Sequence, residues 1–104
     1  MNKVILMGRL TRDPELRYTQ STNIPVSNFT IAVNDNSGKE RKTYFFNIVA
    51  WNKTGEFVSK YFKKGQQVSI IGKITNRSFE DKNGNKKDIT EILAEEVYFA
   101  DSRK

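Results

Sequence analysis

Two segments of the chain combine aromatic and basic side chains at a spacing of two residues. In the first, residues 44–51, the period of a β-strand places Phe45 and Trp51 on one face together with Asn47 and Val49. The same period places four other residues on the opposite face: Tyr44, Phe46, Ile48 and Ala50. One small core cannot bury both faces, so one aromatic face must meet solvent, a second subunit or a ligand. Lys53 follows in phase with Phe45.

The second segment places two cations and one aromatic ring on a common strand face, namely Lys73, Arg77 and Phe79, with Thr75 between them. Bases offer π-faces for stacking and phosphates attract cations, so both segments are candidates for binding single-stranded nucleic acid. The alternative is that the rings are core and interface residues, since most aromatic side chains are buried, and that the second face is solvated.

The chain of 104 residues contains neither His nor Cys. This composition excludes disulfides, thiolate chemistry, cysteine-based zinc sites and catalytic triads that need His. The carboxylates form no catalytic or metal-binding motif, and no phosphate-binding glycine loop is present. We therefore expect no enzyme activity, no metal and no cofactor. No apolar run is long enough for a membrane span or a signal-peptide core, so a cytoplasmic protein without a membrane partner is the default expectation.

The net charge of +6 is unevenly distributed along the chain. Residues 43–87 carry nine basic and three acidic groups, whereas residues 88–104 carry two basic and five acidic groups. An electropositive middle favours a polyanionic partner. The alternative is a lysine-rich surface that serves solubility alone.

Hydrophobic periodicity predicts five strands and one short helix. The strands are expected at residues 2–9, 24–33, 43–51, 68–77 and 89–99, and the helix at residues 53–64, with Lys63 and Lys64 in its last turn and Gly65 after its end. Residues 11–23 are expected to form a loop with one short extended piece at 16–18. Asn83-Gly84 predicts a hairpin turn. Gly8 indicates a bulge or a close backbone approach, and the break in alternation between Val26 and Phe29 indicates a second bulge.

Five strands with one helix between the third and fourth are the order of an OB-fold, an all-β Greek-key barrel. We expect residues 1–100 to form this domain and residues 101–104 to be a polar stub. The face that such folds usually use for binding would here carry the aromatic segment. Phe46, Ile48 and the apolar first strand, with Val4 and Leu6, supply more apolar surface than one small barrel can hide. They therefore predict an oligomer.

Short motifs in this order and spacing resemble the bacterial and phage single-stranded DNA-binding protein (SSB) family. The resemblance covers about residues 2–99. The matching motifs are residues 2–6, 8–10, 13–15, 17–18, 48–53 and 61–65, with Val68, Ile70 and Gly72. It implies an OB-fold that assembles as a homotetramer. It also implies that Phe45, Trp51 and Phe79 stack on bases. The phosphate-facing cations that it implies are Lys3, Arg9, Arg17, Lys53, Lys64, Lys73 and Arg77. Phe46 matches a subunit-interface position.

The chain departs from the family pattern at three places. Ser37 stands where some members carry a further stacking Trp, and Phe46 replaces a polar residue of some members. Members usually continue into a linker and an acidic tip, so replication and repair proteins are expected partners only of a form with such a tail.

We expect sequence-tolerant binding of single-stranded DNA, which coats and protects it in replication, recombination and repair. The alternatives are a primosome-type or RNA-binding OB module that acts as a dimer, and an assembly module that binds no nucleic acid.

Overall fold

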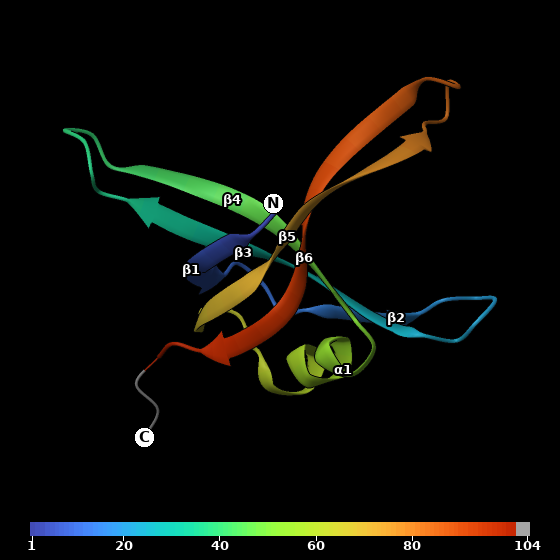
Figure 1. Cartoon of the computed structure of the whole chain (residues 1–104), viewed down its shortest axis with the longest axis horizontal. Coiled ribbons are helices and arrows are strands. Elements are labelled where there is room, and N and C mark those ends of the chain that lie inside the picture. The colour runs from blue at the N-terminus through green and yellow to red at the C-terminus, as the bar shows by residue number, and fades with distance from the viewer. Residues whose placement is uncertain (102–104) are drawn as a thin grey trace.

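Six strands and one helix make up residues 1–101, the part of the chain that the computed structural model describes (Figure 1). In chain order these are β1 (Val4–Leu10), β2 (Glu15–Tyr18), β3 (Pro25–Asp35), β4 (Lys42–Trp51), α1 (Asn52–Tyr61), β5 (Gln67–Glu80) and β6 (Lys86–Phe99). The predicted short extended piece at residues 16–18 is the strand β2. It carried little periodic signal because all four of its residues are exposed.

The strand pairings close into a ring. The hydrogen-bonded order is β1-β5-β6-β4-β3-β2, and β1 also pairs with β3 through Arg9–Ala32 and Leu10–Ile31. Pairing is antiparallel except between β4 and β6, which meet in parallel at Ile48–Ile92 and Val49–Leu93. The ring therefore contains β1, β3, β4, β5 and β6, with α1 between its third and fourth strands. This is the predicted OB-fold order, and β2 is an added edge strand.

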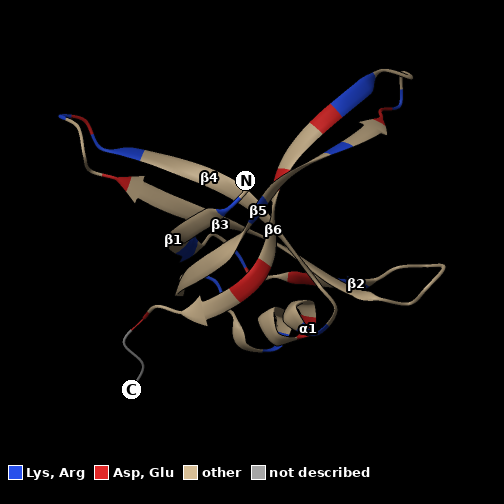
Figure 2. Cartoon of the chain, viewed as in Figure 1, with Lys and Arg blue, Asp and Glu red and all other residues tan. Residues whose placement is uncertain are grey.

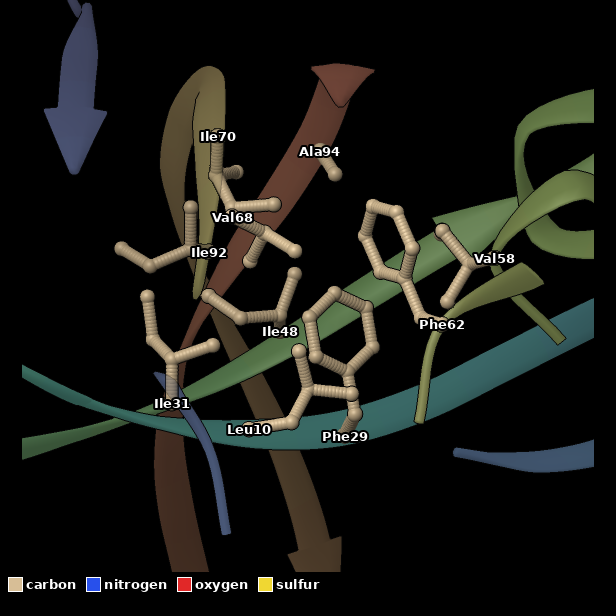
Figure 3. Close-up of a cluster of buried hydrophobic side chains, with 11 residues drawn as sticks. Leu10, Phe29, Ile31, Ile48, Val58, Phe62, Val68, Ile70, Ile92 and Ala94 are labelled. Carbon is tan, nitrogen blue, oxygen red and sulfur yellow. The ribbon is translucent and has the colours of Figure 1, made fainter. Parts of the chain in front are cut away.

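The core lies inside this ring, where alternate residues of the strands meet one side of the helix (Figure 3). Phe29 of β3 and Phe62, which follows α1, pack edge to face with ring centroids 6.1 Å apart. The strands contribute Leu10, Ile31, Ile48, Ala50, Val68, Ile70, Ile92 and Ala94, and the helix contributes Val58. Burying these side chains removes apolar surface from water, which is the main stabilising term of the fold.

The helix is shorter than predicted. It ends at Tyr61, and the backbone of Phe62 is extended at φ −90° and ψ 139°, so the Phe62 ring turns into the core. Lys63 and Lys64 therefore lie in the following loop and not in a last helical turn. Their backbone N–H groups donate hydrogen bonds to side-chain oxygens of Gln66 and Asp13, at 2.7 and 2.8 Å.

One of the two expected backbone irregularities is present. A Cβ on Gly8 would lie 2.5 Å from the carbonyl oxygen of Ala32, so this glycine permits a close approach of β1 to β3. The bulge expected between Val26 and Phe29 is wrong, because β3 pairs with β4 without interruption. The break in alternation there is due to Ser27, a buried polar residue beneath the helix. A register shift does occur elsewhere, between β5 and β6 at Ile71/Gly72.

Two hairpins extend from the ring as long arms, β3–β4 and β5–β6 (Figure 1). The tip of the β5–β6 arm is the predicted turn, in which Gly84 has φ +79° and the Asp81 side chain accepts N–H bonds from Asn83 and Asn85. At the other end of β6, the Asp101 carboxylate lies 3.6 Å from the Arg9 guanidinium. The rest of the predicted stub, 102–104, lies outside the described residues. Within 1–101, no helix has the length and apolar character needed to cross a membrane.

Candidate nucleic-acid interface

The three predicted stacking rings all lie on the surface. Phe45 is 65% exposed, and Trp51 and Phe79 are each 40% exposed. The alternation expected for β4 is observed, since Ile48 and Ala50 point into the core and Phe46 packs against it from the same face. Phe45, Trp51 and Phe79 therefore do not fill the core of this chain, and a ligand or a subunit interface is left as the partner of each ring.

Trp51 lies in a groove of about 400 Å³ between the two arms. On one side the pairing of β2, β3 and β4 places Arg17 and Trp51 on either side of Val26. On the other side are residues of the β5–β6 arm, including Arg77. The full lining is Arg17, Asn28, Val49, Trp51, Thr75, Asn76, Arg77, Glu91 and Leu93. Three predicted site residues are thus brought together from β2, β4 and β5.

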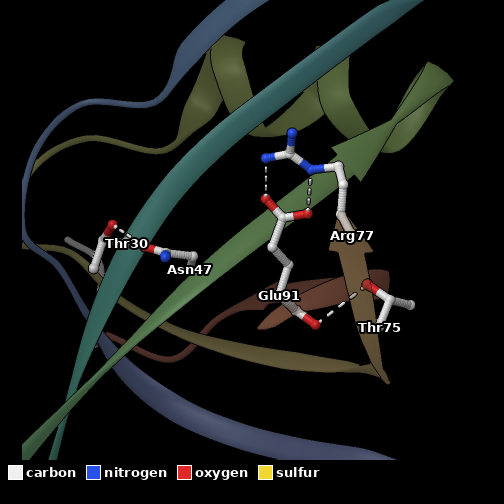
Figure 4. Close-up of polar contacts among 5 residues, drawn as sticks. All are labelled: Thr30, Asn47, Thr75, Arg77 and Glu91. Atoms are coloured by element: carbon white, nitrogen blue, oxygen red, sulfur yellow. Dashed lines mark hydrogen bonds and ion pairs between the residues drawn. The ribbon is translucent and has the colours of Figure 1, made fainter. Parts of the chain in front are cut away.

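A second hollow continues the groove. It shares Asn28, Arg77 and Glu91 with the first and extends to Arg12, Thr30 and Asn47. The Thr30 hydroxyl donates a 3.1 Å hydrogen bond to the Asn47 side-chain oxygen across β3 and β4 (Figure 4). Together the two hollows form an elongated surface that suits an extended chain better than a compact ligand.

The Arg77 guanidinium forms two hydrogen bonds to one carboxylate in this groove. Its Nε and Nη2 atoms donate to the two oxygens of Glu91, at 3.3 and 3.1 Å (Figure 4). This pairing raises the pKa of Arg77 above its usual value, since the hydrogen bonds and the negative charge of Glu91 favour the cation. Arg77 is therefore a charged group whose neutralising partner is already in place.

Lys53 adjoins the groove at its other end. It lines a hollow with Trp51, Tyr18 and the start of α1. The remaining predicted cations are exposed, but they are not part of the groove lining: Lys3, Arg9, Lys64 and Lys73. Arg9 donates a 2.9 Å hydrogen bond to the Gly65 carbonyl oxygen and approaches Asp101, so it ties β1 to its neighbours.

Both hairpin arms carry charges of both signs. Figure 2 shows Lys and Arg on the outer parts of both arms with Asp and Glu among them, and further acidic residues on β6 at the opposite end of the ring. Phe45 and Phe79 each lie on one arm, in strands β4 and β5. The arms thus carry aromatic and cationic side chains together, outside the groove that they flank.

Ser37 lies in the loop between β3 and β4. Some members of the family that the sequence resembles carry a Trp at this position. Its hydroxyl and its backbone N–H both donate to the Asp35 carboxylate, at 2.6 and 3.0 Å. These bonds, the hydroxyl first, lower the pKa of Asp35 below its usual value. The position therefore stabilises a turn and offers no stacking surface.

Sequence reasoning missed several groove residues. Tyr18 and Asn28 lie on β2 and β3, and Thr75 was recognised only as a neighbour of the cations. The polar Asn28 in a half-buried strand was a usable signal. Glu91 had no such signal, because only the pairing of β5 with β6 brings its carboxylate to Arg77.

Of the four residues predicted for a subunit interface, one is buried and three are half-buried within this chain. Ile48 is 1% exposed and belongs to the core, while Val4, Leu6 and Phe46 are half-buried against that core. Their side chains are used by the chain itself. The exposed apolar residues of β1 are instead Ile5, which is 71% exposed, and Met7. Through Ser69 of β5, Met7 is in register with the exposed Tyr98 of β6.

Comparison with known proteins agrees with this architecture. Residues 1–100 match the model of the Single-strand binding protein family. The single-stranded DNA-binding protein of Halalkalibacterium halodurans is 45% identical over 99% of this chain, which spans 62% of that relative. The corresponding protein of Caldanaerobacter subterraneus is 44% identical over 99% of this chain and 70% of the relative. Single-stranded DNA-binding protein 1 of Clostridium acetobutylicum is 40% identical over the whole of this chain and 97% of its own length.

The match spans both arms, the groove and the helix, which are the parts of the fold that carry the exposed rings. It also extends through the ring strands that position them. The chain belongs to the single-strand binding protein family.

Proposed function

We propose that the chain binds single-stranded DNA with little sequence preference, and that it coats and protects such strands in replication, recombination and repair. The observation that carries this proposal is the groove between the two arms, which holds Trp51 beside Arg17 and Arg77. The relatives above bear the name single-stranded DNA-binding protein, which supports the same ligand. We propose a cytoplasmic location for this function.

The proposed affinity has two sources. Stacking of bases on Trp51, Phe45 and Phe79 contributes about 1–3 kcal/mol per base and tolerates any base, since every base has a π-face. Contacts of exposed cations such as Arg17 and Lys53 with phosphates release counterions and make binding depend on salt. The stacking contribution needs an unpaired strand, because a duplex hides its base faces. The phosphate contribution does not distinguish a single strand from a duplex.

A competition experiment tests the proposal. A labelled dT oligomer is bound to the protein and then displaced by unlabelled single-stranded DNA, single-stranded RNA or duplex DNA. We expect single-stranded DNA to compete at the lowest concentration and duplex DNA to compete poorly. Equal or better competition by RNA would favour the RNA-binding alternative, and the absence of any binding would refute a nucleic-acid function.

We further propose that copies of the chain self-associate, with four subunits as the resemblance to the family implies. The support is the exposed apolar row on β1, Ile5 and Met7, which adjoins Ile71 of β5 and Tyr98 of β6. Contiguous apolar surface of this kind is typical of subunit contacts. A homodimer remains the alternative, and mass measurement by light scattering distinguishes the two.

A further inference from the structure

The pair formed by Arg77 and Glu91 separates Arg77 from the other cations of the groove. The Glu91 side chain is only 14% exposed, whereas that of Arg77 is 55% exposed. Both residues line both hollows, so the pair lies where the two hollows meet. The Thr75 hydroxyl also bonds the backbone carbonyl of Glu91, at 3.3 Å.

The carboxylate occupies one of the edges by which the Arg77 guanidinium can bind a phosphate through paired N–H groups, and the Nη1–Nη2 edge stays open. Two parallel N–H groups, Nε and Nη2, already donate to the two oxygens of Glu91, and this is the fork geometry by which Arg binds phosphate. A phosphate on the paired edge would have to displace a largely buried carboxylate, and a phosphate on the open edge would meet a cation whose charge Glu91 already offsets. Because leaving a buried charge unpaired is costly and the charge of Arg77 is already compensated, Arg77 is a weaker phosphate contact than an unpaired Arg.

The flat face of the guanidinium is not used by this pairing. Arg guanidinium planes stack on nucleic-acid bases, and a plane held by two hydrogen bonds loses little freedom when a base is placed on it. Trp51 lines the same groove and offers a second flat surface. Arg77 is thus suited to act as a stacking surface rather than as a counter-charge.

We propose that Arg77 contacts a base of the bound strand and not a phosphate, with Glu91 as the positioning residue that neutralises and orients its guanidinium. This inference rests on the proposed function, because it concerns the way in which that same groove holds its ligand. It replaces the phosphate-facing role that the resemblance implied for Arg77.

Arg17 provides a matched control within the same groove. It is exposed, and it has no ion pair among residues 1–101. Its charge is free to meet a phosphate. Arg17 and Arg77 therefore differ in whether a carboxylate already neutralises them, and their substitutions are expected to change the salt dependence of binding differently.

The test measures the binding constant of a dT oligomer against salt concentration for wild type, Arg17→Gln, Arg77→Lys and the double variant Arg77→Gln with Glu91→Gln. The double variant leaves the charge of the groove unchanged. We expect Arg17→Gln to reduce the logarithmic salt slope by about one, the effect of losing one phosphate contact. We expect the double variant to bind about five-fold or more weakly with an unchanged slope, as for a lost stacking contact.

Arg77→Lys preserves the positive charge and removes the planar guanidinium. If the double variant does not fold, this variant alone distinguishes a base contact from a phosphate contact. A base contact predicts weaker binding to dT with an unchanged slope, and wild-type binding to an abasic oligomer of equal length. Wild-type binding of Arg77→Lys to dT, or a slope reduced by about one in the double variant, overturns the inference. If the wild-type chain binds no dT oligomer, the proposed function fails as well, which is a different result.

Glu91→Gln tests the positioning role separately. Without the carboxylate charge the Arg77 guanidinium regains an uncompensated positive charge next to the strand. The salt slope should then steepen by about one relative to wild type, a change that a merely structural residue would not produce. An unchanged slope in a folded Glu91→Gln variant that binds dT overturns the role assigned to Glu91.

Discussion

The buried hydroxyl of Ser27 donates a 2.7 Å hydrogen bond to the backbone carbonyl oxygen of Gly55. This bond joins β3 to the first turns of α1, directly after Trp51. The helix lies so close to the sheet that a Cβ on Gly55 would be 2.5 Å from the carbonyl oxygen of Ala50. The position of Trp51 at the edge of the groove therefore depends on the contact between Ser27 and Gly55.

Replacing Ser27 with Ala should destabilise the fold. The substitution removes a buried side-chain hydrogen bond to the Gly55 carbonyl, which should cost about 0.5–1.5 kcal/mol of unfolding free energy. Denaturant unfolding measures this loss. Ser21→Ala is the control, because Ser21 is exposed and should tolerate the change within about 0.5 kcal/mol. Equal stability of both variants would show that the bond is dispensable.

Trp51 should report binding through its fluorescence, since it is the only Trp of the chain. Stacking of a base on the exposed ring should quench its emission when poly-dT is added. Trp51→Ala should weaken binding by about 1–3 kcal/mol. Its stability loss should stay below the ~3–5 kcal/mol typical of a buried aromatic residue. Unchanged emission at saturation, with binding detected by another probe, would contradict the stacking role.

Introducing a charge at Ile5 should dissociate the oligomer without unfolding the chain. Ile5→Lys places an unpaired ammonium in the proposed interface, at a cost of several kcal/mol, so the variant should lose mass at micromolar concentration in light scattering. Ser21→Lys adds the same charge on a distant loop and should leave the mass unchanged. A monomeric wild-type protein at that concentration would end the proposal of self-association.

Tyr98 should ionise at higher pH than a tyrosine in a model peptide. Its hydroxyl donates to the Glu96 carboxylate, and this bond, together with the negative charge of Glu96, raises the pKa of Tyr98 above its usual value of about 10. Because the folded pKa is the higher one, the stabilisation is complete below about pH 10 and is lost as pH rises through the folded pKa.

Tyrosinate absorbance during alkaline titration checks this expectation. Glu96→Gln removes the charge and should move one titration step back toward about pH 10, and Tyr98→Phe should remove that step altogether. A titration curve identical in wild type and Glu96→Gln would show that the two side chains do not interact in solution.

The strand period placed Phe45 and Trp51 on one face of β4 and Ile48 and Ala50 on the other, because successive side chains of a strand point to opposite faces. Both faces are largely apolar, so the period alone left open which of them meets the core. In β1 it gave no answer either. Residues 4–7 are all apolar, so the sequence contains no difference from which to decide that Val4 and Leu6 face the core and Ile5 and Met7 face solvent.

Sequence by itself determined the OB-fold order and the basic middle of the chain, because each rests on local periodicity or composition. It left open whether the three aromatic rings are exposed. Tertiary structure alone decided which cations share the groove with Trp51 and which of them is already neutralised. Glu91 lies 14 residues after Arg77, and its carboxylate reaches the guanidinium only because the β5–β6 pairing places Arg77 opposite Ile89 and Thr75 opposite Glu91. Such a register is set by packing along the whole hairpin, and a single residue of slip would turn the carboxylate to the other face.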